Sequence, residues 1–154
     1  MRELLTIMGA VPDLSTGQNW PLAHSWPIYE ATWRLPPSRD PKSRATGTWS
    51  CRLSDEVLCW SPAVYALFGI PVEERLTRSL TLSFYLPHSR SALETLRAHA
   101  IRHKRGFSLD ARIRRPDGEL RWMRLTAAPV LCEGRVIRLE GTKEDVTRVH
   151  EGNG

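Results

Sequence analysis

Two alternating runs joined by a turn, residues 107–130, constrain the fold of this chain more than any other feature. In FSLDARIR, residues 107–114, apolar side chains alternate with polar ones, as on a half-buried strand. The apolar set is Phe107, Leu109, Ala111 and Ile113. The following Pro116-Asp117-Gly118 suits a tight turn, because proline presets the first central position and glycine accepts a positive φ. The pattern predicts an antiparallel hairpin.

The second run of this hairpin, LRWMRLTAAPV, is apolar on both faces. Leu120 and Trp122 lie on one face, and Met123, Leu125 and Ala127 lie on the other. One face is expected to close the core, and the other needs a cover from the N-terminal segment or from a partner.

Shorter patterns predict the remaining elements. GTWSCRL (47–53) and VLCWS (57–61) indicate a hairpin, SPAVYALFG indicates a helix ending at Gly69, and residues 70–87 look irregular. A long helix is expected from Ser89 to Arg105, with Gly106 ending it and with Leu96, Ala100 and His103 on its inward arc. RVIRLEGTKEDVT then predicts a last strand.

Residues 1–46 differ in composition and are interpreted as an extension with a linker, followed by a domain at 47–149 and a tail at 150–154. SWPIYEATWRL suggests that a helix starts near Ser25, so the extension is expected to be partly helical. Three of the six tryptophans lie here, and they are expected to pack on the domain or on a partner chain: Trp20, Trp26 and Trp33.

Composition favours a protein of the cytoplasm. The 154 residues contain no apolar run long enough to span a membrane and no signal-peptide cleavage pattern. The net charge of +5 raises the question of nucleic-acid binding. The arginines are spread over several elements, however, and no recognition motif accompanies them, so a solvated basic surface is favoured and no nucleic acid is expected.

Enzymatic chemistry and metal binding are poorly supported, and we expect no enzyme. Nucleophile-elbow, zinc-protease and phosphate-loop motifs are absent from the sequence, and Asp110, Asp117 and Glu119 are interpreted as solvated carboxylates. His99 and His103 have an i, i+4 spacing without a third ligand.

Cys51 and Cys59 are placed symmetrically about Asp55, so a redox disulfide would need them to face each other across the first hairpin. Reduced thiols are favoured.

Several stretches, in order, resemble a PAS domain of the PAS fold 3 type: GTWSCRL, VLCWSPAVYALFGIP, RIRRPDGELRWMRLTAAPV and RLEGTKEDVT. The resemblance covers Gly47 to Val149, and the last stretch matches the G-x-x-x-D-[IV]-T ending that precedes an output helix. One departure is YLPHSR, where the family often has His-Pro-Asp-Asp at the start of the long helix.

The resemblance implies an α+β fold, with a five-stranded antiparallel sheet of order 2-1-5-4-3, helices on one face and a pocket between them. It also implies a bacterial sensory or interaction module, usually dimeric and attached to histidine kinases of two-component systems, cyclic-di-GMP enzymes or transcription regulators. Some relatives bind haem through a histidine of the long helix, and others bind flavin through an N-C-R-F-L-Q motif. The motif is missing here, which disfavours flavin, and His99 and His103 lack a third ligand, which disfavours haem. The cofactor therefore stays unknown.

The first hypothesis is therefore a PAS module that senses a small molecule or relays a signal by dimerisation, and the alternative is a ligand-free adaptor that docks a signalling partner through its sheet face. The expected pocket residues are Tyr65, Phe68, Phe84, Leu96, His103, Leu109, Met123 and Leu125. The expected interface residues are Trp20, Trp26, Trp33, Leu120 and Trp122.

Overall fold

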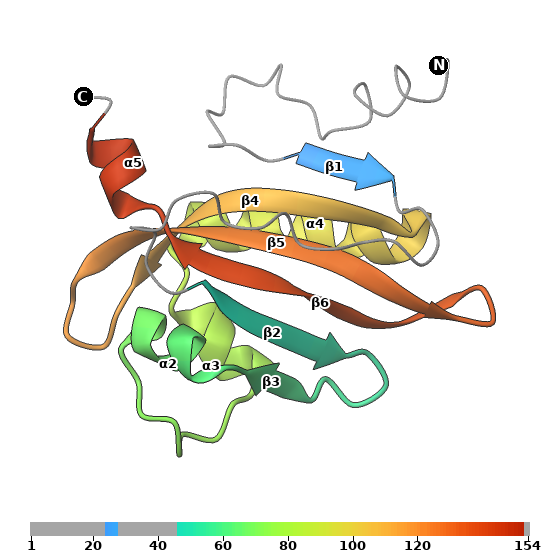
Figure 1. Ribbon diagram of the computed structural model, residues 1–154, viewed down its shortest axis with the longest axis horizontal. Helices are drawn as coiled ribbons and strands as arrows, with labels where there is room; N and C mark the ends of the chain where they lie inside the picture. The colour runs from blue at the N-terminus through green and yellow to red at the C-terminus, as the bar shows by residue number, and fades with distance from the viewer. Residues whose placement is uncertain (1–23, 28–45, 153–154) are drawn as a thin grey trace.

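A six-stranded antiparallel sheet forms the frame of the computed structural model, which describes residues 24–27 and 46–152 (Figure 1). The strands are β1 (His24–Pro27), β2 (Gly47–Arg52), β3 (Leu58–Trp60), β4 (Arg105–Arg114), β5 (Leu120–Cys132) and β6 (Arg135–Asp145). Their order is β1-β4-β5-β6-β2-β3. Without β1 this is the expected order 2-1-5-4-3, which is confirmed, and β1 is an additional edge strand paired with β4.

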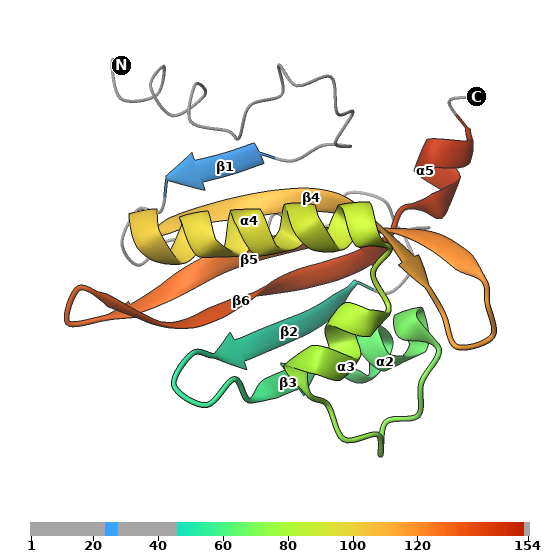
Figure 2. The ribbon, with the colours of Figure 1, turned by 180° about the vertical axis from the view of Figure 1, so that it is seen from behind.

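Three helices cover one face of this sheet. They are α2 (Pro62–Phe68), α3 (Arg78–Ser83) and α4 (Pro87–His103). Helix α4 runs along β4 and β5, while α2 and α3 lie beside β2 and β3 (Figure 2). A short C-terminal helix, α5 (Thr147–Glu151), follows β6 and stands at the other end of the sheet from the β5–β6 turn. Among the described residues, no helix is long and apolar enough to cross a membrane.

The hairpin that joins β4 and β5 has the predicted turn. Gly118 N–H donates to the carbonyl of Arg115 at 2.9 Å, and Arg115 N–H donates to Glu119 O at 2.9 Å. Gly118 has a φ of 89°, the left-handed region that glycine enters without steric cost. The turn fixes the register that places Leu109 opposite Leu125. Both leucines consequently point to the same face.

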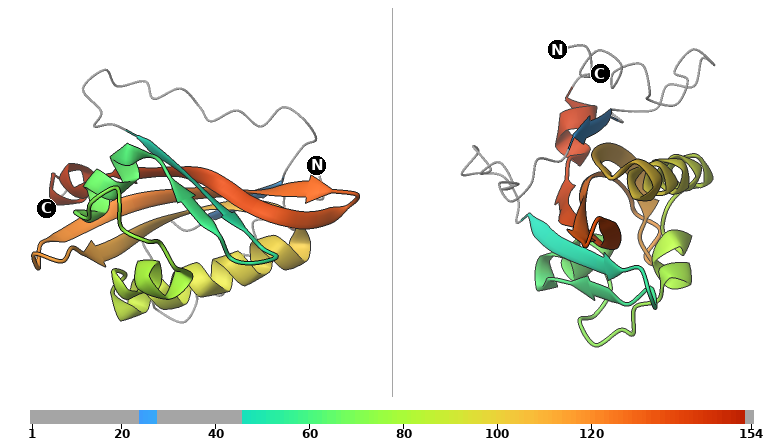
Figure 3. Two further views of the ribbon diagram at one scale, coloured as in Figure 1. Left: turned by 90° about the horizontal axis from the view of Figure 1, so that it is seen from below. Right: turned by 90° about the vertical axis from the view of Figure 1, so that its right-hand side faces the viewer.

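The alternation along β4 and β5 decides which residues form the core. Phe107, Leu109, Ile113, Met123 and Leu125 are all nearly inaccessible, and they face the helices. The opposite face of the two strands carries Leu120 and Trp122, where the alternation placed them, among mostly polar side chains. Figure 3 shows the same layering from two sides, with α4 and α3 against one face of the curved sheet.

Three local expectations differ from the structure. Residues 24–27 form a strand and not the start of a helix, because they pair in register with the edge of β4. Helix α4 ends at His103, three residues before Gly106, since Lys104 itself takes the left-handed conformation at a φ of 56°. The segment predicted as irregular contains α3, whose start is capped by Thr77 Oγ1 accepting from Leu80 N–H at 3.1 Å.

The first hairpin also has a different register from the one that the disulfide required. Cys51 lies opposite Leu58, and Cys59 lies opposite Ser50. Cys51 is therefore buried on the inner face, whereas Cys59 is exposed on the outer face. Successive side chains of a strand point to opposite sides, so the two thiols cannot meet across this hairpin.

Candidate functional site: a core cavity and the junction with the C-terminal helix

A cavity of about 60 Å³ lies between the helices and the inner face of the sheet. Its wall is formed by α3, α4, the connection between them and five strands, β2 to β6. The lining residues are Trp49, Cys51, Leu58, Arg78, Thr81, Leu82, Tyr85, Leu93, Glu94, Arg97, Phe107, Leu125, Leu139 and Lys143. The place is the one that the sequence pattern predicted, but the set of residues is largely different.

Of the eight expected pocket residues, Leu125 lines this cavity. Five others are buried in the surrounding core: Phe68, Phe84, Leu96, Leu109 and Met123. Tyr65 is half-buried and packs against the same core. His103 is exposed, which corrects its placement on the inward arc. The helix turns left-handed directly after His103, so its last turn extends beyond the core.

His103 lies instead beside His99, with 4.5 Å between their ring centroids. Partial burial, and then the charge of His103, lower the pKa of His99. Across the described part of the chain, no group of three histidine, cysteine or acidic side chains is arranged to hold a metal ion. The two histidines therefore form no metal site together with described residues.

The sequence analysis missed Lys143, which is 5% exposed and points into the core. Its Nζ lies 4.7, 4.9, 5.5 and 5.8 Å from the ring centroids of Trp60, Phe68, Trp49 and Tyr85. The amine donates a hydrogen bond to the hydroxyl of Tyr85 at 3.3 Å. Aromatic faces attract a cation, and four aromatic side chains surround this amine.

Burial decides the protonation of this pair. It lowers the pKa of Lys143 from 10.5 to about 7, since a charged amine loses its hydration inside the core. Burial also raises the pKa of Tyr85, which stays a neutral phenol. The strand alternation contained the signal for Lys143, because Leu139, Gly141 and Lys143 share one face of β6.

Two arginines line the helical side of the cavity. Arg78 in α3 pairs with Glu94 in α4 and approaches Glu56 at 3.7 Å. Arg97 in α4 lies 3.6 Å from the same Glu56 carboxylate. The acidic partners are about half exposed, so this side of the cavity faces the surface, whereas Lys143 closes its inner end.

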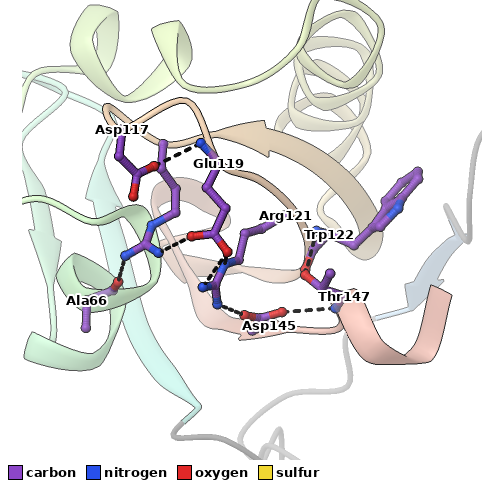
Figure 4. Close-up of polar contacts among 8 residues, drawn as sticks. Ala66, Asp117, Glu119, Arg121, Trp122, Asp145 and Thr147 are labelled. Atoms are coloured by element: carbon purple, nitrogen blue, oxygen red, sulfur yellow. Dashed lines mark hydrogen bonds and ion pairs between the residues drawn. The ribbon is translucent and has the colours of Figure 1, made fainter. Parts of the chain in front are cut away.

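A chain of polar contacts leads from α2 to the start of α5 (Figure 4). Arg115 donates to the carbonyl of Ala66 in α2 at 3.1 Å and pairs with Glu119 at 2.8 Å. Glu119 also accepts from Arg121 at 2.9 Å, and Arg121 reaches Asp145 at 2.6 Å. Glu119 is therefore bonded to two arginines, whereas the sequence pattern had been interpreted as a solvated carboxylate at this position.

Asp145 holds the first turn of α5. Its Oδ1 accepts the N–H of Thr147 at 2.9 Å, which satisfies a free donor at the helix start. Thr147 Oγ1 in turn accepts the N–H of Trp122 at 3.0 Å, and Val146 N–H donates to Trp122 O at 2.9 Å. The Asp-Val-Thr ending therefore fastens α5 to β5.

The far side of α5 rests on the outer face of the sheet. The ring of His150 stacks on Trp122 with 4.2 Å between centroids, and its Nε2 lies 2.8 Å from Asp110. Asp110 is fully buried and also receives two hydrogen bonds from Arg124, at 2.7 and 2.9 Å. Asp110 is thus a structural carboxylate that joins β4, β5 and α5, and it is not the solvated group that we expected.

Three of the five expected interface residues belong to the described part of the chain. Trp20 and Trp33 lie outside the described residues, and Trp26 belongs to β1 by its backbone. Leu120 is 37% exposed, whereas Trp122 is half-buried because His150 of the same chain lies on its ring. Its other neighbour is the guanidinium of Arg112, 5.5 Å from the ring centroid.

Comparison with known sequences gives the family. A profile of the PAS fold matches residues 57–143. Over 108 residues the chain is 30% identical to the probable diguanylate cyclase DgcE of Escherichia coli K12. That alignment covers 70% of this chain and 10% of DgcE, so the chain spans about a tenth of the length of this curated relative.

Solved structures show the same fold. The N-terminal domain of a diguanylate cyclase with a PAS/PAC sensor from Marinobacter aquaeolei has a TM-score of 0.64 and 18% identity, covering 69% of this chain and 99% of that one. A sensory box histidine kinase/response regulator from Burkholderia thailandensis has a TM-score of 0.61 and 18% identity, with coverages of 70% and 82%. A light-oxygen-voltage domain studied with a flavin analogue has a TM-score of 0.58 and 20% identity, covering 70% of this chain and 82% of that one. At these identities the likeness concerns the fold.

Proposed function

The chain belongs to the PAS fold family, and we propose that it works as a sensory module in which the core cavity controls how firmly α5 is held on the sheet. A change of occupancy or charge in the cavity would alter how α5 is held, and a protein segment or partner that contacts α5 would respond. The observation that carries this proposal is the unbroken polar chain from the backbone of α2 to the first turn of α5.

The aromatic rings around Lys143 and the polar chain both include a residue of α2. Phe68, one of the four rings around Lys143, lies two residues after Ala66, whose carbonyl holds Arg115. A shift of α2 that follows a change at Lys143 would therefore move the Arg115 contact as well. Such a shift alters the balance between a docked and a released α5 only if the two states differ in their affinity for whatever occupies the cavity.

The first test weakens the link that touches α5 directly. In Arg121→Met, Asp145 loses its charged partner, and we expect the amide exchange of Val149 and His150 to rise about fivefold, as for a loss of about 1 kcal/mol. Both amides donate to Val146 O in the docked helix. The matched control is Arg102→Met, on the exposed side of α4. Equal exchange in the two variants would contradict the proposal.

We further propose that the module acts as a homodimer and signals to a kinase or cyclase. Its relatives combine a PAS domain with a kinase or a cyclase in one protein. Among the described strands β1 pairs with β4 alone, and its other edge is the strand edge that we propose for association. Light scattering over a range of concentrations tests this. A mass of twice 17.5 kDa supports it, and a mass of 17.5 kDa at 200 µM contradicts it.

A second candidate is a ligand-free adaptor, and the small size of the cavity favours it. A space of about 60 Å³ is far below the several hundred that a haem or flavin needs. Native mass spectrometry of protein purified from cells separates the candidates: a bound small mass supports the sensor, and an empty protein that still captures a kinase supports the adaptor.

A further inference from the structure

The amine of Lys143 is under-satisfied. An ammonium group has three N–H donors, and the hydroxyl of Tyr85 is the acceptor found for it, at 3.3 Å. None of the ion pairs among the described residues includes Lys143. A cation that is 5% exposed therefore sits in the core with aromatic faces, and no carboxylate, around it.

The rest of the cavity wall leaves that charge uncompensated. Arg78 and Arg97 border the cavity as well, but Glu56 and Glu94 pair with them. Lys143 is thus the cation that still lacks an anion. An isolated buried charge is among the costliest features of a core, and a partner of opposite charge relieves it.

The volume limits what such a partner is. A water molecule needs about 10–15 Å³ of cavity volume. A cavity of about 60 Å³ therefore has room for roughly four to six atoms of the size of a water oxygen. Five leucines supply apolar wall to the same cavity: Leu58, Leu82, Leu93, Leu125 and Leu139. A short chain with one anionic head and a small hydrocarbon end fits both the size and the polarity.

We propose that this cavity binds a small carboxylate of two or three carbons, such as acetate or propionate, with its carboxylate on the Nζ of Lys143 and its methyl end among the leucines. The inference rests on the proposed sensory function and names its ligand class. The hydroxyl of Thr81 in α3 is buried and lines the same cavity, and it donates to the carbonyl of Arg78 at 2.9 Å.

Binding of this kind is linked to a proton. Burial holds the pKa of Lys143 near 7, so at pH 8 the empty cavity contains mostly neutral amine. A bound carboxylate favours the charged form, because an adjacent opposite charge raises the pKa of an amine. Each carboxylate that binds at pH 8 therefore brings close to one proton with it.

The test is isothermal titration calorimetry of the whole chain with sodium acetate and sodium propionate at pH 8, against sodium chloride at the same ionic strength. Repeating the titration in Tris and in HEPES reveals proton uptake as a difference between the two measured enthalpies. We expect saturable 1:1 binding, uptake of close to one proton, at least tenfold weaker binding by Lys143→Met, and unchanged binding by Lys104→Met.

Three results would overturn the inference: no saturable binding up to 50 mM, equal binding by Lys143→Met, or binding without proton uptake. The proton measurement uses the unmodified protein, so it decides even if the variant does not fold. These failures are distinct from a failure of the proposed relay. A chain that binds no carboxylate still supports the relay if α5 responds to a change at Lys143, and a chain that binds carboxylate without a response at α5 contradicts the relay alone.

Discussion

Replacing Lys143 by methionine should stabilise this protein, and by an amount that depends on pH. The lysine pKa is 10.5 for the free side chain and about 7 in the core. At about 1.4 kcal/mol for each pH unit, the buried charge costs about 5 kcal/mol below pH 7. The methionine leaves the buried hydroxyl of Tyr85 without its amine partner, which costs about 1–2 kcal/mol. Methionine has a similar length and fills the same space without a charge, so Lys143→Met should gain about 3 kcal/mol at pH 6.5.

The sign of the pH dependence follows from proton counts. Between pH 7 and 10.5 the unfolded chain keeps a proton on Lys143 that the folded chain has lost. The free energy of unfolding therefore rises with pH in this window. From pH 6.5 to pH 9 this amounts to about 2–3 kcal/mol for the natural protein, and the gain from Lys143→Met should shrink by the same amount.

Urea unfolding followed by circular dichroism measures both quantities at pH 6.5 and pH 9. Taking the difference between the two proteins cancels the titration of every group except Lys143. Lys104→Met serves as the control, because Lys104 is exposed and should change stability by less than about 0.5 kcal/mol at either pH. A stability difference between Lys143→Met and the natural protein that stays constant with pH would refute the reasoning.

Three other outcomes follow from the contacts. Asp110→Asn should cost about 2–3 kcal/mol in urea unfolding and should release His150, seen as a shift of its ring resonances; an unshifted ring would contradict the role of Asp110. Gly141→Ala should destabilise by about 3 kcal/mol or more, since its Cβ would clash with the carbonyl oxygen of Thr126 in β5. Gly134→Asn should cost only about 1 kcal/mol, because the site is open and asparagine is among the few residues that enter the left-handed region, here at a φ of 75°. Thiol titration should find two fast groups and a slow Cys51, whose pKa burial raises; a disulfide between Cys51 and Cys59 after mild oxidation, identified by peptide mass mapping, would contradict the register of the first hairpin.

The sheet and its register were predictable because their determinants are local. The alternation in residues 107–130 and the Pro-Asp-Gly turn are sufficient to place Leu109 and Leu125 in the core, and the structure confirms both. Helix α2 was predictable for the same reason, since Pro62 and Gly69 mark its two ends. These signals act over a few residues and need no knowledge of the tertiary contacts.

The cavity and the junction were harder to predict because their determinants are far apart in the chain. The sequence pattern predicted the strand that contains Lys143 without singling this residue out, although its face of β6 was readable from Leu139. Nothing in the sequence shows that rings from β2, β3, α2 and the α3–α4 connection converge on it. The interpretation of Asp110 failed similarly, because its burial depends on α5, 40 residues away.

The central claim is that the cavity controls α5 through the polar chain, and a double-variant experiment on amide exchange tests it most directly. The exchange of Val149 and His150 is measured in the natural protein, in Lys143→Met, in Arg121→Met and in the double variant. The account predicts that Lys143→Met changes the exchange of α5 in the natural background and has no effect when Arg121 is already replaced. An equal change in both backgrounds, or no change in either, would contradict it.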